Sequence, residues 1–358
     1  MFKFISTLFL TSLALHPAAA TDTQCPDPLA YNSSVQDRRF DKTKLKLMQY
    51  NVEWLFLDYY GAADCPGDGC TWKNESEAVE HFGYVKNIID TIDPDIINFC
   101  EIEGCDELMA LQGNLTGFEY NPFLIKGTDT ATGQNVGMLS RIDPTSSLNR
   151  TEEKLYYPVD GSECGYTSNG TTGVSKHYIS HFNINDMDIA IISAHLIAFP
   201  TDKARCSKRE AQATILQNEI YNHLQQGYEV IMMGDFNDFD NLVEDMNDDV
   251  PNSMVLDILK GNKGAHAGKY SLTSVAENIP QELRFTDWYD SDNNCNTSSK
   301  NDYSMIDHIL VSSTLKSSIS DTTIYHGYKE YCGKMNSDHY PVIVEFDFSN
   351  LYNDFRMG

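Results

Sequence analysis

The sequence predicts a large fold of the α/β or α+β class, and two observations support this. The chain has 358 residues, of which 41% are hydrophobic, so it can build one large core. Apolar segments of strand length dominate, and segments with helical periodicity lie between them. No internal repeat or long linker divides the chain, so we expect one domain over residues 45–350, preceded by an extension over 21–44.

The expected elements alternate along the chain. The helix at 76–92 has apolar residues near one face and stops before Pro94. Asn185 and Asp186 form the turn of a predicted hairpin, and Gly227 is a plausible cap for a second helix. Strands are predicted at 45–56, 95–102, 176–184, 186–196, 228–237, 303–312 and 338–348, helices at 76–92 and 207–227, and loops at 145–175 and 280–302.

The first twenty residues are typical of a secretory signal peptide. Lys3 precedes an apolar run that is too short to span a bilayer, and small residues follow it. No other segment is long and apolar enough to be a membrane anchor, so we expect a secreted, soluble protein that acts as a monomer. Six Asn-x-Ser/Thr sites predict surface glycosylation, and they lie at Asn32, Asn74, Asn114, Asn149, Asn169 and Asn296.

All nine cysteines follow the predicted signal peptide, so most should form disulfides in an oxidising compartment. The odd number leaves at least one free or intermolecular, and a short loop disulfide between Cys65 and Cys70 is plausible. The formal charge of −26 argues against broad, charge-driven binding of nucleic acid. It does not exclude a small site in which a bound metal reverses the local sign.

Several predicted strands end in a residue that can bind a metal or move a proton. Because so many such ends would be unusual by chance, we expect them to converge on one site. This set suits the hydrolysis of phosphate esters, since carboxylate and amide oxygens hold Mg²⁺ and an acid or imidazole can move protons. The strand ends carry Asn51, Glu101, His195, Asp235 with Asn237, Asp307, and Asp338 with His339.

Six motifs occur in one order along the chain: QYNVEWL, NFCEIE, ISAHL, GDFND, IDHIL and SDHYPV. In this order they closely resemble the endonuclease/exonuclease/phosphatase superfamily, which includes deoxyribonuclease I, abasic-site endonucleases, neutral sphingomyelinases and inositol polyphosphate 5-phosphatases. The resemblance covers residues 45 to 347. It implies a four-layered sandwich of two mixed β-sheets flanked by helices, and a divalent metal.

The resemblance also implies a role for each motif residue. Asn51, Glu101 and Asp338 would form the metal site, with Mg²⁺ expected, Mn²⁺ as a substitute and a structural Ca²⁺ as a further option. His195 would contact the phosphate. The remaining roles are water activation by Asp235, water orientation by Asn237, and proton chemistry by His339, which Asp307 would orient.

Neighbours of these motifs favour ordinary structural roles. His308 should point away from Asp307 by strand alternation, and loop packing is favoured for Asp287. Cys100 replaces the usual glutamine before the motif glutamate and is expected to be a buried small residue. Lys176 lies loosely where some family nucleases keep a phosphate-binding arginine. Solvated or indirect roles are expected for Glu103, Asp238 and Asp240.

We expect the substrate to be nucleic acid, because a secreted nuclease fits the predicted signal peptide, disulfides and glycans. A sphingomyelinase-type activity on membrane lipid is the alternative, although the sequence lacks a clearly apolar insert for gripping a bilayer. An inositol phosphatase is less favoured, because no lysine- and arginine-rich pocket is evident. A non-catalytic binding protein on this scaffold is disfavoured, since every motif position holds a competent residue.

Overall fold

The protein is described from a computed structural model. The predicted signal peptide and the predicted Cys65–Cys70 disulfide lie outside the described residues. None of the helices in the described part of the chain combines the length and the apolar character needed to cross a bilayer. The described residues are 25, 35–57, 71–117, 119–290, 292, 294–296, 298–328 and 336–349.

The first sheet has six strands in the order β14-β15-β1-β2-β4-β3. The neighbours β1 and β2 are parallel, and every other pair in this sheet is antiparallel. The strands are β1 (Lys44–Leu55), β2 (Ile96–Ile102), β3 (Asn121–Phe123), β4 (Asn135–Ser140), β14 (Ile319–Ile324) and β15 (Val342–Asp347).

The second sheet has five strands in the order β10-β13-β9-β8-β7. Here β8 and β9 are parallel, and the other pairs are antiparallel. Its strands are β7 (Lys176–Ile184), β8 (Met187–His195), β9 (Glu229–Asp235), β10 (Thr273–Ser274) and β13 (Asp307–Val311). Two small hairpin sheets pair β5 (Leu155–Tyr157) with β6 (Gly170–Thr172) and β11 (Asp287–Trp288) with β12 (Tyr303–Ser304).

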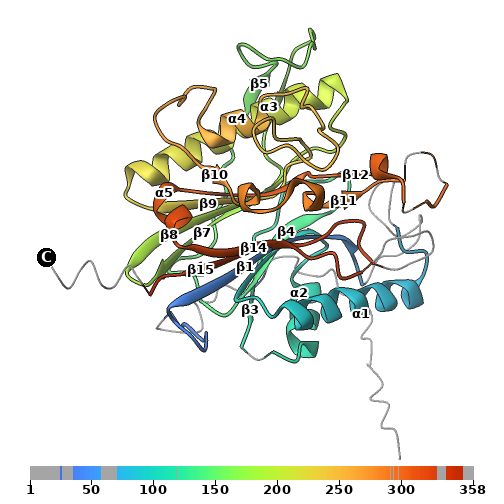
Figure 1. Cartoon of the computed structure of the whole chain (residues 1–358), viewed down its shortest axis with the longest axis vertical. Helices are drawn as coiled ribbons and strands as arrows, with labels where there is room; N and C mark the ends of the chain where they lie inside the picture. Colours follow the sequence, from blue (N-terminus) through green and yellow to red (C-terminus); the bar gives the residue numbers. More distant parts are fainter. Residues whose placement is uncertain are drawn as a thin grey trace, which may run out of the picture.

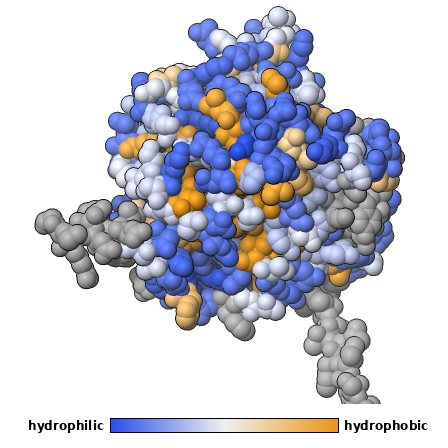
Figure 2. All heavy atoms as spheres, viewed as in Figure 1, coloured by the Kyte–Doolittle hydropathy of each residue, from blue (hydrophilic) through white to orange (hydrophobic). Residues whose placement is uncertain are grey.

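Three clusters of buried apolar side chains define four layers (Figure 1). The central cluster lies between the sheets, the second joins the six-stranded sheet to α1 and α2, and the third joins the five-stranded sheet to α3 and α4. The helices are α1 (Glu75–Ile92), α2 (Cys105–Asn114), α3 (Lys203–Gln225), α4 (Val255–Lys260) and α5 (Ser313–Ser317), with 3₁₀ turns at Val275–Asn278, Gln281–Leu283 and Lys300–Asp302. The face in Figure 2 is mainly hydrophilic, with apolar residues in small patches.

Strand alternation decides which side chains reach the space between the sheets. In β9, Ile231 and Met233 belong to the central cluster, whereas Val230 and Met232 pack toward α3. Asp235 has the parity of Met233, so it lies on the inner face. The same rule places the ends of β1, β8 and β13 at this inner edge, and the predicted strand ends therefore meet between the two sheets.

The predicted four-layered α/β sandwich with two mixed sheets is confirmed. The hairpin turn is also as predicted, since Asn185 and Asp186 both adopt positive φ angles of 56° and 62°. Two segments predicted as loops contain short strands, β5 and β6 in one and β11 in the other. The predicted helix at 207–227 begins earlier, at Lys203, because Asp202 caps it by accepting a hydrogen bond from Arg205 N.

Disulfides are confirmed in the described part of the chain. One bond ties the segment before β1 to the start of α2, and another ties the 145–175 region to α3. Cys295 is also disulfide-bonded. Cys100 is a free, buried cysteine, as expected, and burial raises the pKa of its thiol. These two bonds join Cys25 to Cys105 and Cys164 to Cys206.

Candidate active site

Three predicted site residues form one row across the five-stranded sheet. His195 ends β8, Asp235 ends β9 and Asp307 begins β13. The strand register pairs His195 with Asp235, and Asp235 with Asp307. Directly paired residues point to the same face of a sheet, so the three side chains stand next to one another in the space between the sheets.

Gly234 allows β9 to approach β8 closely just before this row. Its φ angle is +149°, and a Cβ atom there would lie 1.8 Å from the carbonyl oxygen of Ala194. Only glycine fits that backbone without a clash. The glycine of the GDFND motif therefore sets the position of the carboxylate that follows it.

His339 is held by Asp307. Its Nδ1 lies 2.7 Å from Asp307 Oδ2, and Gln49 Nε2 donates to the other carboxylate oxygen over 3.1 Å. Burial alone would lower the pKa of His339, but the Asp307 carboxylate outweighs it and holds this pKa well above the usual range. His339 is therefore an imidazolium at neutral pH, with Nε2 facing the acidic cluster.

His195, in contrast to His339, is a neutral imidazole. Burial lowers the pKa of His195 well below its ordinary value, and the positive charges of Lys176 and His339 lower it further. Its Nε2 lies 3.5 Å from Asp235 Oδ2 and 3.8 Å from Glu101 Oε1. Its Nδ1 is buried and has no hydrogen-bond partner among the described residues. The site thus holds one neutral and one protonated imidazole.

Glu101 reaches the site through a bulge in β2. The register between β2 and β4 shifts between Cys100 and Ile102, and Glu101 adopts a φ of +68°. Without the bulge, alternation would turn the Glu101 side chain toward the helices. Instead, its carboxylate accepts hydrogen bonds from Asn51 Nδ2 at 3.3 Å and Trp54 N at 3.2 Å. Asn51 Nδ2 also lies 3.0 Å from Asp235 Oδ2, and this links the two sheets.

Glu53 is a site carboxylate that the sequence analysis did not identify. Its Oε2 accepts a hydrogen bond from Asp338 N at 3.0 Å. Burial raises the pKa of Glu53 well above its usual range, and the charges of Asp338 and Glu101 add to this. Strand alternation could not have placed it, because the pairing of β1 with β2 shifts register between Asn51 and Leu55 and Glu53 adopts a φ of 44°.

Asp287 also belongs to the site, so the expectation of a loop-packing role is wrong. It lies in β11 and forms an isolated bridge with His339. Its Oδ1 is 3.6 Å from His339 Nε2. Burial raises the pKa of Asp287 to about 7 despite the opposing effect of His339. No local pattern indicated this position, because it depends on a contact between segments about fifty residues apart in sequence.

Asp238 and Asp240 point away from the row, as expected of indirect roles, but both are buried in ion pairs and are not solvated. Asp238 Oδ2 accepts hydrogen bonds from Arg209 Nε at 2.9 Å and from Ser253 Oγ at 2.7 Å, and Asp240 is paired with Lys260. His308 turns away from Asp307, since its Nε2 contacts the carbonyl oxygen of Asp238 at 2.9 Å. Asn237, in contrast, stays close to the row, because its backbone N–H donates to Asp235 Oδ1 at 2.9 Å.

Comparison with known proteins shows which family the chain belongs to. The model of the endonuclease/exonuclease/phosphatase family matches residues 48–339. The chain belongs to this family. Its membership of this family makes it a hydrolase that acts on phosphate esters. No curated protein sequence matches it.

Solved structures share the fold at low sequence identity. D. rerio TDP2 complexed with single strand DNA product is 17% identical, with a TM-score of 0.50, and the match covers 85% of this chain and 99% of that one. A humanized D. rerio TDP2 is 15% identical, with a TM-score of 0.51 and the same coverage. The Bacteroides thetaiotaomicron mannosyl-6-phosphatase Bt3783 is 17% identical, with a TM-score of 0.48 over 84% of this chain and 98% of that one.

The donor set of this family member fits a divalent cation. The ligand atoms of Glu101, His195 and Asp235 lie within 4.8 Å of one another, and so do those of Asp287, Asp338 and His339. Burial raises the pKa values of Asp235 and Asp338 to about 7, and repulsion from other carboxylates adds to this. Crowded oxygen donors that repel one another are what a hard cation neutralises. A third set, Cys164 with Cys206 and Glu210, is not a metal site, since its cysteines form a disulfide.

A groove of about 850 Å³ opens beside Glu101 and His195. Lys176 lines it and is the strand partner of His195. The Lys176 ammonium donates to Gln134 Oε1 at 3.0 Å and lies 3.8 Å from Asp129 Oδ2. A cation therefore stands at the mouth of the site, on the side where the groove begins.

Proposed function

We propose that this protein is a secreted, Mg²⁺-dependent phosphodiesterase that hydrolyses nucleic acid. One observation carries the proposal: the row of His195, Asp235 and Asp307, with His339 held on Asp307, has two further carboxylates beside it. Glu101 Oε1 lies 3.8 Å from His195 Nε2, and Asp338 Oδ1 lies 3.8 Å from His339 Nε2. The row supplies proton chemistry and these two carboxylates supply metal ligands, which are the two requirements of metal-assisted phosphoester hydrolysis.

Each side chain has a role that its contacts support. Asp235, with a pKa of about 7, accepts a proton from the attacking water. Asn237 orients that water with its side-chain oxygen, since its Nδ2 is held by the carbonyl oxygen of Leu196 at 3.2 Å. Neutral His195 donates a hydrogen bond to a phosphate oxygen. Protonated His339 stabilises negative charge on the phosphate, and Asp307 fixes its orientation.

Mg²⁺ would be held by Glu101 and Asp338, with Asn51 and Glu53 beside them. When bound, it would neutralise phosphate charge and stabilise the leaving oxygen, and Mn²⁺ should substitute for it. His339 is not a ligand in this proposal, because its Nδ1 is occupied by Asp307 and its ring is protonated.

Three further observations support the choice of substrate and location. A groove with several basic residues adjoins the site of a chain whose net charge is −26. The D. rerio TDP2 structure shows a similar fold in complex with a single strand DNA product. The sequence begins with a pattern typical of signal peptides, and the described part contains disulfides, which form in oxidising compartments.

The substrate prediction is tested by offering the purified protein four substrates in parallel with Mg²⁺, with and without EDTA. These are plasmid DNA, single-stranded RNA, sphingomyelin vesicles and an inositol phosphate. We expect cleavage of nucleic acid that EDTA abolishes, and no phosphocholine release. Phosphocholine release without nucleic-acid cleavage would assign the protein to the lipid branch of the family. No turnover of any substrate would favour a binding protein.

A further inference from the structure

The groove beside the site carries a small positive net charge, whereas the whole chain is strongly negative. Five of its lining residues are basic and four are acidic, a net of +1, whereas the whole chain carries −26. One of the four acids is Glu101, a proposed metal ligand, so the rest of the groove is more positive still. Such local reversal attracts an anionic ligand that the remaining surface repels. The basic residues are Arg150, Lys154, Lys176, Arg205 and Lys208.

Arg150 is built into the groove wall and keeps a donor free. Its Nη2 donates to the carbonyl oxygens of Val174 at 3.0 Å and Ser175 at 3.3 Å, and its Nη1 lies 3.1 Å from Glu152. Its side chain is 8% exposed, yet its buried Nε has no partner within the described part of the chain. The positive charge of this partly buried guanidinium favours an anion, such as a phosphate, at this wall of the groove.

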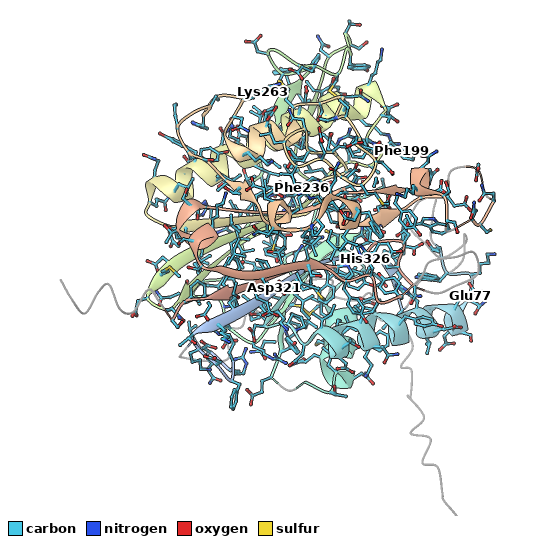
Figure 3. All side chains as sticks on the ribbon, viewed as in Figure 1. Glu77, Phe199, Phe236, Lys263, Asp321 and His326 are labelled. Carbon is cyan, nitrogen blue, oxygen red and sulfur yellow. A yellow bond between two sulfur atoms is a disulfide. The ribbon has the colours of Figure 1, made fainter. Side chains whose placement is uncertain are left out.

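Phe199 presents an aromatic ring at the same groove. It is 56% exposed and adopts a φ of +69°, which is unfavourable for a side chain of this size. In Figure 3, Phe199 lies near the edge of the molecule, whereas Phe236 lies in the interior. A strained backbone that exposes an apolar ring persists only where the surrounding structure enforces it, and such residues cluster at ligand sites.

A fully buried ion pair enforces this conformation. The Arg209 guanidinium donates to the carbonyl oxygens of Ile197 at 3.1 Å, Phe199 at 2.9 Å and Pro200 at 2.7 Å. Its Nε donates to Asp238 at 2.9 Å, and both side chains are inaccessible to solvent. The hydrogen bonds from Arg209 thus fix the backbone of the Phe199 loop. From the other side, Arg205 Cζ lies 4.3 Å from the Phe199 ring centroid.

We propose that the groove binds a single-stranded segment of the nucleic-acid substrate, with a base stacked on Phe199 and neighbouring phosphates bound by Lys176 and Arg150. This rests on the proposed function. Stacking on an exposed ring requires an unpaired base, and a groove of about 850 Å³ suits a few nucleotides of one strand rather than a duplex. Aromatic stacking beside a cationic path is the usual physical basis of sequence-independent single-strand binding.

The test compares wild-type protein with Phe199→Ala on a thymidine 12-mer and on bis-p-nitrophenyl phosphate, a single diester with no neighbouring nucleotides. We expect KM for the 12-mer to rise about tenfold to hundredfold, with kcat retained and the small diester unaffected. Phe40→Ala is the matched control, since Phe40 is fully exposed and lies before β1 begins, at the opposite end of that strand from Asn51.

Each other outcome contradicts a defined claim. Unchanged KM for the 12-mer in Phe199→Ala would overturn the stacking proposal and leave the nuclease assignment intact. Equal losses on both substrates would show that Phe199 supports the active site rather than the strand. A wild-type protein that cleaves plasmid DNA or RNA but not the 12-mer would overturn the single-strand proposal, and one that hydrolyses only the small diester would overturn the nucleic-acid assignment itself.

A second measurement tests the cationic path without catalysis. In the Asp235→Asn background with Mg²⁺, a fluorescent 12-mer is titrated over a range of salt concentrations. Replacing Lys176 with glutamine should reduce the slope of log K against log salt by about 0.7 for each lost phosphate contact. Lys263→Gln is the control, because Lys263 is paired with Glu163 and does not line the groove. An unchanged slope for Lys176→Gln would contradict the proposed phosphate contact at Lys176.

Discussion

Replacing Asp235 with asparagine is expected to lower kcat by about two to four orders of magnitude while the fold stays intact. The amide oxygen can still accept the hydrogen bond from Asn237 N, but the side chain loses the second acceptor that Asn51 Nδ2 uses, and it cannot take a proton from water. The measurement is kcat on one phosphodiester, together with thermal unfolding. Near-normal turnover would remove Asp235 from the role of general base.

The same substitution should stabilise the metal-free protein in a pH-dependent way. Burial raises the pKa of Asp235 from 3.8 to about 7, so the folded protein holds this proton over a range in which the unfolded chain has lost it. The wild-type carboxyl therefore costs stability as pH rises from about 4 to about 7. In EDTA, Asp235→Asn should unfold at higher urea concentration than wild type at pH 8 and at a similar concentration at pH 4. A lower midpoint at both pH values would contradict this account.

Asp238→Asn should have the reverse phenotype, although Asp238 lies only three residues away. Asp238 and Arg209 are both fully buried and paired, so the substitution leaves a buried guanidinium without its counter-charge. Breaking such a pair costs about 3 to 5 kcal/mol of unfolding free energy. The check is urea unfolding of both variants beside wild type. Turnover of a small diester by the folded fraction should remain within a few-fold of wild type.

These two aspartates are also a test of the site assignment as a whole. If Asp238→Asn lost turnover on the small diester as severely as Asp235→Asn while remaining folded, the catalytic role would not be specific to the row. If both variants were only destabilised, the row would be a structural feature and not a catalytic one.

The layout of the site could be predicted from the ends of the strands. Asp235 and Asp307 each stand at the boundary of an apolar strand, and alternation fixes the face on which they lie. The bulge that aims Glu101 could not be predicted, because it depends on pairing with β4, a strand whose short apolar segment was not recognised. The polar strand β14 was missed for a different reason, since most of its side chains are at least partly exposed at a sheet edge.

The groove was missed because many of its residues come from the predicted loop at 145–175 or from the segment just before the predicted helix at 207–227. Arg150 follows no apolar pattern, and the role of Phe199 depends on a backbone that Arg209 holds from α3, the helix that follows it. Asp287 reaches His339 only through the pairing of β11. Such contacts are long-range in sequence, so propensity and periodicity carry no information about them.

The most direct test of the central claim is the Mg²⁺ dependence of kcat/KM on one phosphodiester for wild type and Glu101→Gln. We predict that wild-type activity is abolished by EDTA, restored by Mg²⁺ and saturable, because Glu101 and Asp338 lie where a cation would offset the carboxylate repulsion. Glu101→Gln should need at least about tenfold more Mg²⁺ for half-maximal activity. Turnover that is insensitive to EDTA, or a Glu101→Gln variant with the wild-type Mg²⁺ dependence, would contradict a metal-dependent phosphoesterase site at this position.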